Sequence, residues 1–195
     1  MTEGLRESRW LPERLDGDPL RVALLVPGGG YTPDRPLLHF ARAVLRKHGW
    51  TTQELWWPTR PPPVEGEWPD WVNAQVADML DRESADSLLL VGKSLGTMAA
   101  TTAADRELPA IWLTPLLHQP WLAGELRRAT APTLLVGGTA DHSWIPSLAR
   151  ELPHPYLELT GADHGLETDD DPVNSADLLK QITAALDEFV AGLKL

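Results

Sequence analysis

Short apolar runs alternate with longer amphipathic segments along this chain of 195 residues. The short runs end at glycine, proline or charged residues, which is typical of strands, and the longer segments repeat apolar residues at helical spacing. We expect strands over 21–26, 50–57, 88–91, 110–114, 133–136 and 156–159, and helices over 36–47, 68–82 and 174–193. Such alternation indicates a parallel sheet with helices on both faces. The sequence therefore predicts an α/β fold, a three-layer α/β/α sandwich with a mainly parallel sheet of about six or seven strands.

A serine lies between two glycines directly after one of these strands. Residues 92–96 read Gly-Lys-Ser-Leu-Gly, and a segment rich in alanine and threonine follows them. A strand, a tight turn and a helix form the setting in which a serine becomes a nucleophile, because the turn lifts its hydroxyl out of the sheet. The alternative is a glycine-flanked turn without chemistry. The choice depends on whether a base and a carboxylate accompany Ser94.

Two other strands end in loops that carry these groups. Asp141 follows the strand at 133–136, and His164 follows the strand at 156–159. Ligands of parallel sheets bind at the carboxyl ends of the strands, so these side chains are expected to meet Ser94 there. A serine needs a base to take its proton, and an imidazole does so near neutral pH. We predict Ser94 as nucleophile, His164 as base and then acid, and Asp141 as the group that orients His164.

Neighbouring residues offer alternatives for the base and the carboxylate. Asp163 lies beside His164, and His142 lies beside Asp141. Adjacent residues rarely point toward each other in the geometry of an Asp–His hydrogen bond, so Asp141 and His164 are preferred. His142 is expected at the rim, where it can touch substrate, and His118 is interpreted as a solvated loop residue. We predict no metal site, since no histidine pair has zinc-ligand spacing with a third ligand.

A tetrahedral intermediate also needs backbone donors for its oxyanion. The N–H of Leu95 is one expected donor, because this residue directly follows the nucleophile. The second donor is expected from the glycine-rich loop after the strand at 21–26. Within that loop Gly29 is the first choice and Gly30 the second.

Four further residues that follow strand ends are candidates for substrate binding. Lys93 is either a solvated side chain at the turn or an exposed cation that attracts an anionic substrate. Tyr31, Leu116 and Trp144 follow three strand-end loops, and each either lines the pocket or packs in the ordinary way.

These motifs resemble those of the α/β-hydrolase superfamily from about Arg21 onward. The order Ser94, Asp141, His164 is the order of that family's triad. The Asp-His-Gly ending is similar to that of small dienelactone-hydrolase-like members. The resemblance implies hydrolysis of esters, thioesters or amides through an acyl-enzyme, with no cofactor. It rests on residues 27–30, 92–96, 138–141 and 163–165.

The chain departs from the family pattern at two places. Many members have His-Gly where this chain has Pro27-Gly28. This difference affects which residue of the loop supplies the second oxyanion donor, because the donor geometry depends on the backbone that follows. Only residues 115–132 separate two successive predicted strands, too few for a separate cap domain. We expect one α/β-hydrolase domain over 1–195 without a cap domain.

Two nucleotide-binding interpretations of the glycine motifs are rejected. The Gly-Lys-Ser at 92–94 is not part of a phosphate-binding loop, because that motif requires glycine at the position that Ser87 occupies. The Gly28-x-Gly30 pattern is followed by Pro33 where a dinucleotide site needs a third small residue. The alternative that stays open is a non-catalytic α/β-hydrolase-fold protein that binds or scaffolds.

The charge balance limits the partners. Seventeen Lys and Arg stand against 28 Asp and Glu, a formal net charge of -11, which argues against nucleic acid or an anionic membrane. The first six residues lack the apolar core of a signal peptide, and no apolar run is long enough to span a bilayer. We expect a cytoplasmic serine hydrolase, of carboxylesterase or thioesterase type, that acts on a small-molecule acyl substrate. The substrate's acyl length and the oligomeric state stay open.

Overall fold

A single seven-stranded sheet organises the computed structural model, which describes residues 13–194. The strands lie in the order β1-β3-β2-β4-β5-β6-β7, and every neighbouring pair is parallel except β1 with β3. Their bounds are β1 (Arg14–Leu15), β2 (Asp18–Val26), β3 (Trp50–Glu54), β4 (Ser87–Lys93), β5 (Ala110–Leu113), β6 (Thr133–Gly138) and β7 (Tyr156–Leu159).

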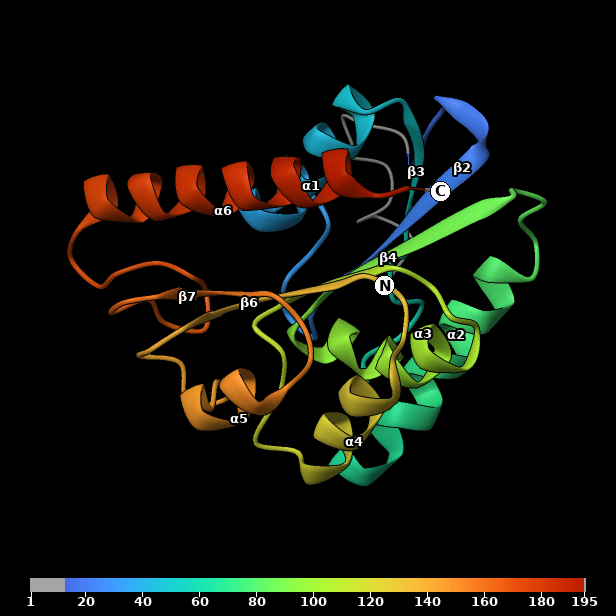
Figure 1. Ribbon diagram of the computed structural model, residues 1–195. Coiled ribbons are helices and arrows are strands. Elements are labelled where there is room, and N and C mark those ends of the chain that lie inside the picture. Colours follow the sequence, from blue (N-terminus) through green and yellow to red (C-terminus); the bar gives the residue numbers. More distant parts are fainter. Residues whose placement is uncertain (1–12, 195) are drawn as a thin grey trace.

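Helices cover both faces of this sheet. Figure 1 shows α1 and α6 on one face and α2, α3, α4 and α5 on the other. The α-helices are α1 (Pro36–Lys47), α2 (Trp68–Leu80), α3 (Ala100–Asp105), α4 (Pro120–Arg128), α5 (Pro146–Glu151) and α6 (Pro172–Gly192), and two 3₁₀ helices are η2 (Glu65–Glu67) and η3 (Ser94–Ala99). The predicted three-layer α/β/α sandwich with a mainly parallel sheet is confirmed.

The alternation of side chains along each strand divides the core into two layers. In β4, Leu89 and Val91 pack with α1 and α6, whereas Leu90 packs with α2 on the opposite face. Both layers are covered, so consecutive residues in the middle of a central strand, such as 88–91 of β4, are apolar.

Most predicted elements are confirmed, with ends that differ by a few residues. The helix over 36–47 and the strand over 156–159 are found with the same bounds, whereas β3 ends at Glu54 instead of 57. The helix expected after Ser94 begins as the 3₁₀ turn η3 before α3 follows. Four elements have no counterpart in the sequence prediction, namely β1, η2, α4 and α5. The strand β1 has only two residues, which is too short for an alternation of apolar and polar residues to be recognised. The helices α4 and α5 are also short, and both begin at a proline.

The topology gathers the strand ends that carry the predicted site. Strands β2, β4, β6 and β7 all run parallel, so the loops that follow them emerge at one edge of the sheet. These loops contain the glycines after Pro27, the Ser94 turn, Asp141 and His164. Residues as far apart in the sequence as Gly28 and His164 are thereby candidates for one site.

Candidate active site

The Ser94 turn is a sharp bend that depends on its two glycines. Ser94 has a φ of 51°, which a non-glycine residue adopts only where its surroundings hold it there. A Cβ on Gly92 would lie 2.5 Å from the Trp112 ring, and one on Gly96 would lie 2.2 Å from the Val26 carbonyl oxygen. The close approach of the turn to neighbouring strands therefore requires glycine at both positions.

Replacing Gly96 by alanine is expected to destabilise the fold by about 2 to 4 kcal/mol, because the Val26 carbonyl belongs to a buried strand that cannot move aside. Thermal unfolding measures this effect. The matched control is Gly124→Ala, at an exposed position of α4 with no atom near the added Cβ, where helix propensity predicts a gain of about 0.5 to 1 kcal/mol. Equal stability of the two variants would contradict the close approach at Gly96.

Ser94, His164 and Asp141 lie in a continuous line of hydrogen bonds. The His164 Nε2 atom is 2.8 Å from the Ser94 Oγ atom, and the His164 Nδ1 atom is 2.8 Å from the Asp141 Oδ2 atom. In the neutral imidazole these contacts allow Nδ1–H to donate to the carboxylate and Nε2 to accept from the serine hydroxyl. The arrangement can move the serine proton onto the imidazole and hold the resulting positive charge beside a carboxylate.

The Asp141 carboxylate is buried, with 3% of the residue exposed. Burial acts to raise its pKa, but hydrogen bonds from His164 and from the Ser143 N–H, which is 2.8 Å from Oδ1, outweigh it. The pKa of Asp141 consequently lies below its ordinary value of 3.8. Asp141 is therefore ionised at neutral pH and can stabilise a protonated imidazole.

The neighbouring acid has a different position. The Asp163 Oδ1 atom accepts hydrogen bonds from the Gly165 N–H at 2.7 Å and the Glu167 N–H at 3.0 Å. Asp163 thus folds the loop that carries His164, while Asp141 contacts the imidazole itself.

Two exposed histidines extend outward from His164. The His142 ring lies 6.2 Å from the His164 ring, and the His118 ring lies 6.1 Å from that of His142. His142 is thus at the rim, where the sequence places it, and its Nδ1 atom is 4.0 Å from Asp141. His118 is exposed, as the sequence interpretation of a solvated loop residue implies, and its position after a strand end is the one sequence signal for its proximity to His142.

The glycine-rich loop after β2 lies against Leu95. A Cβ on Gly29 would be 3.6 Å from the Leu95 Cδ2 atom, whereas Gly30 has no atom within 4 Å of the same position. Leu95 is the second residue of η3, so its N–H has no carbonyl partner within that helix. Gly28 is engaged otherwise, because its N–H donates to the Tyr31 carbonyl at 3.1 Å. Of the two candidate glycines, Gly29 is thus the one that lies against Leu95.

Lys93 differs from both sequence interpretations, which had it solvated or exposed. It is 3% exposed, and its Nζ atom lies 4.9 Å from the centroid of the Tyr31 ring. The residue shares its strand face with Leu89 and Val91, which points its side chain into the layer beneath α1. Burial lowers the pKa of Lys93 to about 8, although the charge of Asp141 acts in the opposite direction. The prediction of an exposed cation is wrong, because α1 and the Tyr31 ring cover this face of β4.

Replacing Lys93 by methionine is expected to stabilise the fold at pH 7 by about 2 kcal/mol. The lowered pKa corresponds to a penalty of about 3 kcal/mol, from which about 1 kcal/mol for the lost contact with Tyr31 is subtracted. Above pH 8 the native lysine loses its proton while the unfolded one keeps it up to 10.5, so the wild type gains stability and the difference shrinks. Denaturant unfolding between pH 7 and pH 10 measures this, with exposed Lys180→Met as the matched control. A Lys93→Met variant that is less stable at pH 7 would refute it.

Two other residues that the sequence offers as pocket candidates, Leu116 and Trp144, are buried. The Trp144 side chain is buried, donates from Nε1 to the Glu158 carboxylate at 2.8 Å and lies against Gly137. Leu116 is also buried, and its N–H points to the Thr97 hydroxyl at 3.4 Å. Both residues support the turn and the strand ends beneath the site.

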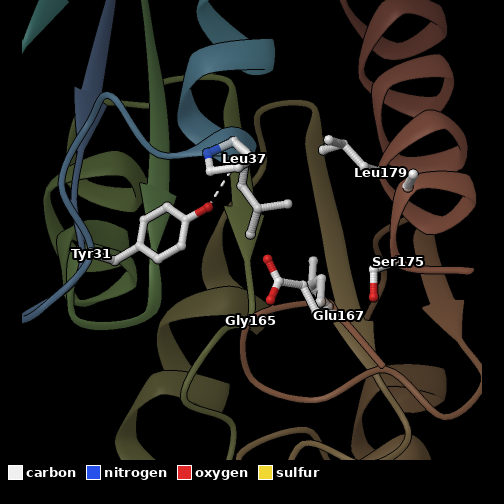
Figure 2. A pocket seen from close by; sticks show the side chains of 9 residues that line it. Tyr31, Leu37, Gly165, Glu167, Ser175 and Leu179 are labelled. Carbon is white, nitrogen blue, oxygen red and sulfur yellow. Dashed lines mark hydrogen bonds between the residues drawn. The ribbon is translucent and has the colours of Figure 1, made fainter. Parts of the chain in front are cut away.

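A hollow of about 130 Å³ lies beside the loop of His164 (Figure 2). Its walls come from the loop after β2, the start of α1, the loop after β7 and the start of α6. The Tyr31 hydroxyl accepts a hydrogen bond from the Leu37 N–H at 2.9 Å on one side, and the Glu167 carboxylate faces it from the other. Apart from Tyr31 no sequence signal marked this hollow, because packing between distant elements forms it. The lining residues are Tyr31, Pro36, Leu37, Gly165, Leu166, Glu167, Ser175, Ala176 and Leu179.

Residues 13–194 contain no group of three or more His, Cys, Asp or Glu that could hold a metal ion. Within the same range, none of the helices combines the length and apolar character needed to cross a membrane.

Solved structures share this fold, whereas comparisons of the sequence with family models and curated proteins find no match. No family model matches the chain, and no curated protein is significantly similar to it. Est1E from Butyrivibrio proteoclasticus with bound ferulic acid is 14% identical, with a TM-score of 0.68 over 92% of this chain and 90% of that one. XC6422 from Xanthomonas campestris, described as an α/β serine hydrolase without a lid, is 19% identical, with a TM-score of 0.58 over 93% and 84%.

A third match extends the range of chemistries on this fold. The monoacylglycerol lipase of Paleococcus ferrophilus is 16% identical, with a TM-score of 0.62 over 90% of this chain and 97% of that one. At such identities these similarities establish the α/β-hydrolase fold alone.

Proposed function

We propose that this protein is a serine hydrolase, of carboxylesterase or thioesterase type, built as a single α/β-hydrolase domain without a cap. The observation that carries the proposal is the pair of 2.8 Å contacts that link Ser94 to His164 and His164 to Asp141. A serine that only shapes a turn does not need an imidazole on its hydroxyl and a buried carboxylate behind that imidazole.

The proposed reaction proceeds through an acyl-enzyme. His164 takes the Ser94 proton as the serine oxygen attacks the substrate carbonyl, and Asp141 stabilises the imidazolium. The N–H groups of Leu95 and Gly29 bind the tetrahedral oxyanion. His164 then returns the proton to the departing alcohol or thiol. In the second half, His164 activates a water molecule that releases the acid and regenerates Ser94.

The solved structures of the same fold suggest the size of the substrate. Est1E was solved with ferulic acid bound, and XC6422 is described as having no lid. By analogy, and because α4 is the one helix between β5 and β6, we infer a small ester substrate in a shallow site. No cofactor takes part in the proposed reaction.

The test is covalent labelling with a fluorophosphonate probe together with turnover of p-nitrophenyl esters and acyl thioesters of increasing chain length. We expect stoichiometric labelling at Ser94 and the highest turnover for short acyl chains. The matched control is Ser147→Ala, which removes an exposed serine on α5 and should leave both readouts unchanged. A correctly folded protein that is neither labelled nor active across the series would overturn the proposal and favour a binding or scaffolding role.

A further inference from the structure

The ammonium of Lys93 lacks a conventional partner. Among residues 13–194 its Nζ atom makes no hydrogen bond or ion pair, and the polar group that it meets is the face of the Tyr31 ring, 4.9 Å away. Lys93 as a whole residue is 3% exposed, and a largely buried cation without a counter-ion reduces the stability of a fold. Features of this kind concentrate at functional sites, and Lys93 directly precedes the proposed nucleophile.

Tyr31 joins two parts of the site, the glycine-rich loop and the start of α1. Its carbonyl oxygen accepts from the Gly28 N–H at 3.1 Å, which closes the glycine-rich loop. Its hydroxyl accepts from the Leu37 N–H at 2.9 Å, at the start of a helix whose N-cap residue, Arg35, makes no side-chain cap. Tyr31 thus fixes the end of the glycine-rich loop to the first turn of α1.

Lys93 lies along the inner side of this loop. Its Cδ atom is 3.5 Å from the position of a Cβ on Gly28, and the Tyr31 Cβ atom is 3.0 Å from the same position. Trp57, which follows β3, also contacts the loop, since its Nε1 atom donates to the Gly28 carbonyl at 2.9 Å. The alkyl chain and ammonium of Lys93 therefore connect the loop to β4, the strand that ends at Ser94.

We propose that Lys93 and Tyr31 are positioning residues, whose ammonium–ring contact holds residues 28–31 against the end of β4 and so aligns the Gly29 N–H with that of Leu95. The inference rests on the proposed hydrolase function, because it concerns the oxyanion donors of that reaction. Backbone donors contribute fully only when held in place before the oxyanion forms. A contact that keeps a donor loop in register thus acts on the rate of the chemical step more than on substrate binding.

Charged groups from several elements face Lys93. Arg35, at the start of α1, acts against its protonation, whereas Asp141 after β6 and Asp163 after β7 act in favour of it. The pKa of Lys93 of about 8 implies that the cation is lost as the pH rises through that value. A neutral amine interacts weakly with a ring face, so we expect turnover to decline on the alkaline side.

The experiment compares Lys93→Met, Lys93→Arg, Tyr31→Leu and exposed Lys180→Met as the control. In Lys93→Met and Tyr31→Leu we expect kcat to fall about 10-fold to 100-fold with KM within about threefold, and Lys93→Arg to retain most of kcat because it keeps a cation over the ring. The alkaline decline near pH 8 should be absent from Lys93→Met. The Tm of Lys93→Met should not fall, which separates positioning from loss of folding.

A second readout does not depend on catalysis. The Gly28 N–H is buried and bonded to Tyr31, so its hydrogen exchange should be at least about tenfold faster in Lys93→Met and Tyr31→Leu than in Lys180→Met. An active wild type whose kcat and Gly28 exchange are unchanged by Lys93→Met would overturn this inference alone. A folded wild type without turnover or labelling would instead overturn the hydrolase proposal on which it rests.

Discussion

Replacing Ser94 by alanine is expected to abolish fluorophosphonate labelling and to reduce ester turnover by about a millionfold. The alanine has no oxygen to attack the carbonyl, so the acyl-enzyme route is lost and the oxyanion donors and bound substrate support at most slow attack by water. Because the missing hydroxyl lies 2.8 Å from the His164 Nε2 atom and is partly exposed, the fold should keep its stability within about 1 kcal/mol.

The measurement needs a companion in which the hydroxyl is kept but the base is lost. His164→Ala retains Ser94 and should lose turnover to a similar extent, because residues that act as one unit give non-additive losses. The double variant should then be hardly slower than either single variant. Independent, multiplying losses would mean that Ser94 and His164 do not work in the same step, contrary to their hydrogen bond.

The site residues that could be predicted from the sequence are those that follow the ends of predicted strands. Ser94, Asp141 and His164 each follow an apolar run, and parallel strands deliver the loops after them to one edge of the sheet. Local pattern and topology together were enough to select these residues. Their mutual contacts depend on a sheet order that hydrophobic periodicity alone does not encode.

Side chains whose surroundings come from distant elements were beyond such reasoning. Lys93 looks like a turn residue, yet it is buried because α1 and Tyr31 cover that face of β4. Trp144 looks like a pocket residue, yet its indole packs against Gly137 and bonds to Glu158. In both cases the burial comes from packing between elements, with α1 over Lys93 and the strands β6 and β7 beside Trp144, whereas a strand-end position indicates only where the backbone leaves the sheet.

The strongest discrimination between the two carboxylates beside the site comes from isosteric amides. Asp141→Asn is expected to reduce kcat by about 10,000-fold at neutral pH, because an amide does not stabilise the imidazolium and can hold the imidazole in the wrong tautomer. Asp163→Asn is the matched control. Its amide oxygen can still accept from the Gly165 and Glu167 N–H groups, so we expect kcat to change by less than about tenfold.

The same pair of variants separates catalysis from acid stability. Since the native pKa of Asp141 lies below its ordinary value of 3.8, its ionised form stabilises the fold above that pH, and the stabilisation is lost as the pH falls through the native pKa. Asp141→Asn has no such titration, so its stability should fall less steeply below pH 4 than that of the wild type. The measurements are kcat at pH 7 and the free energy of unfolding as a function of pH below 5, for both variants and the wild type. If Asp163→Asn lost most of kcat while Asp141→Asn stayed active, Asp163 would be the residue that orients His164. That outcome would contradict the role inferred from the 2.8 Å contact of Asp141 with His164.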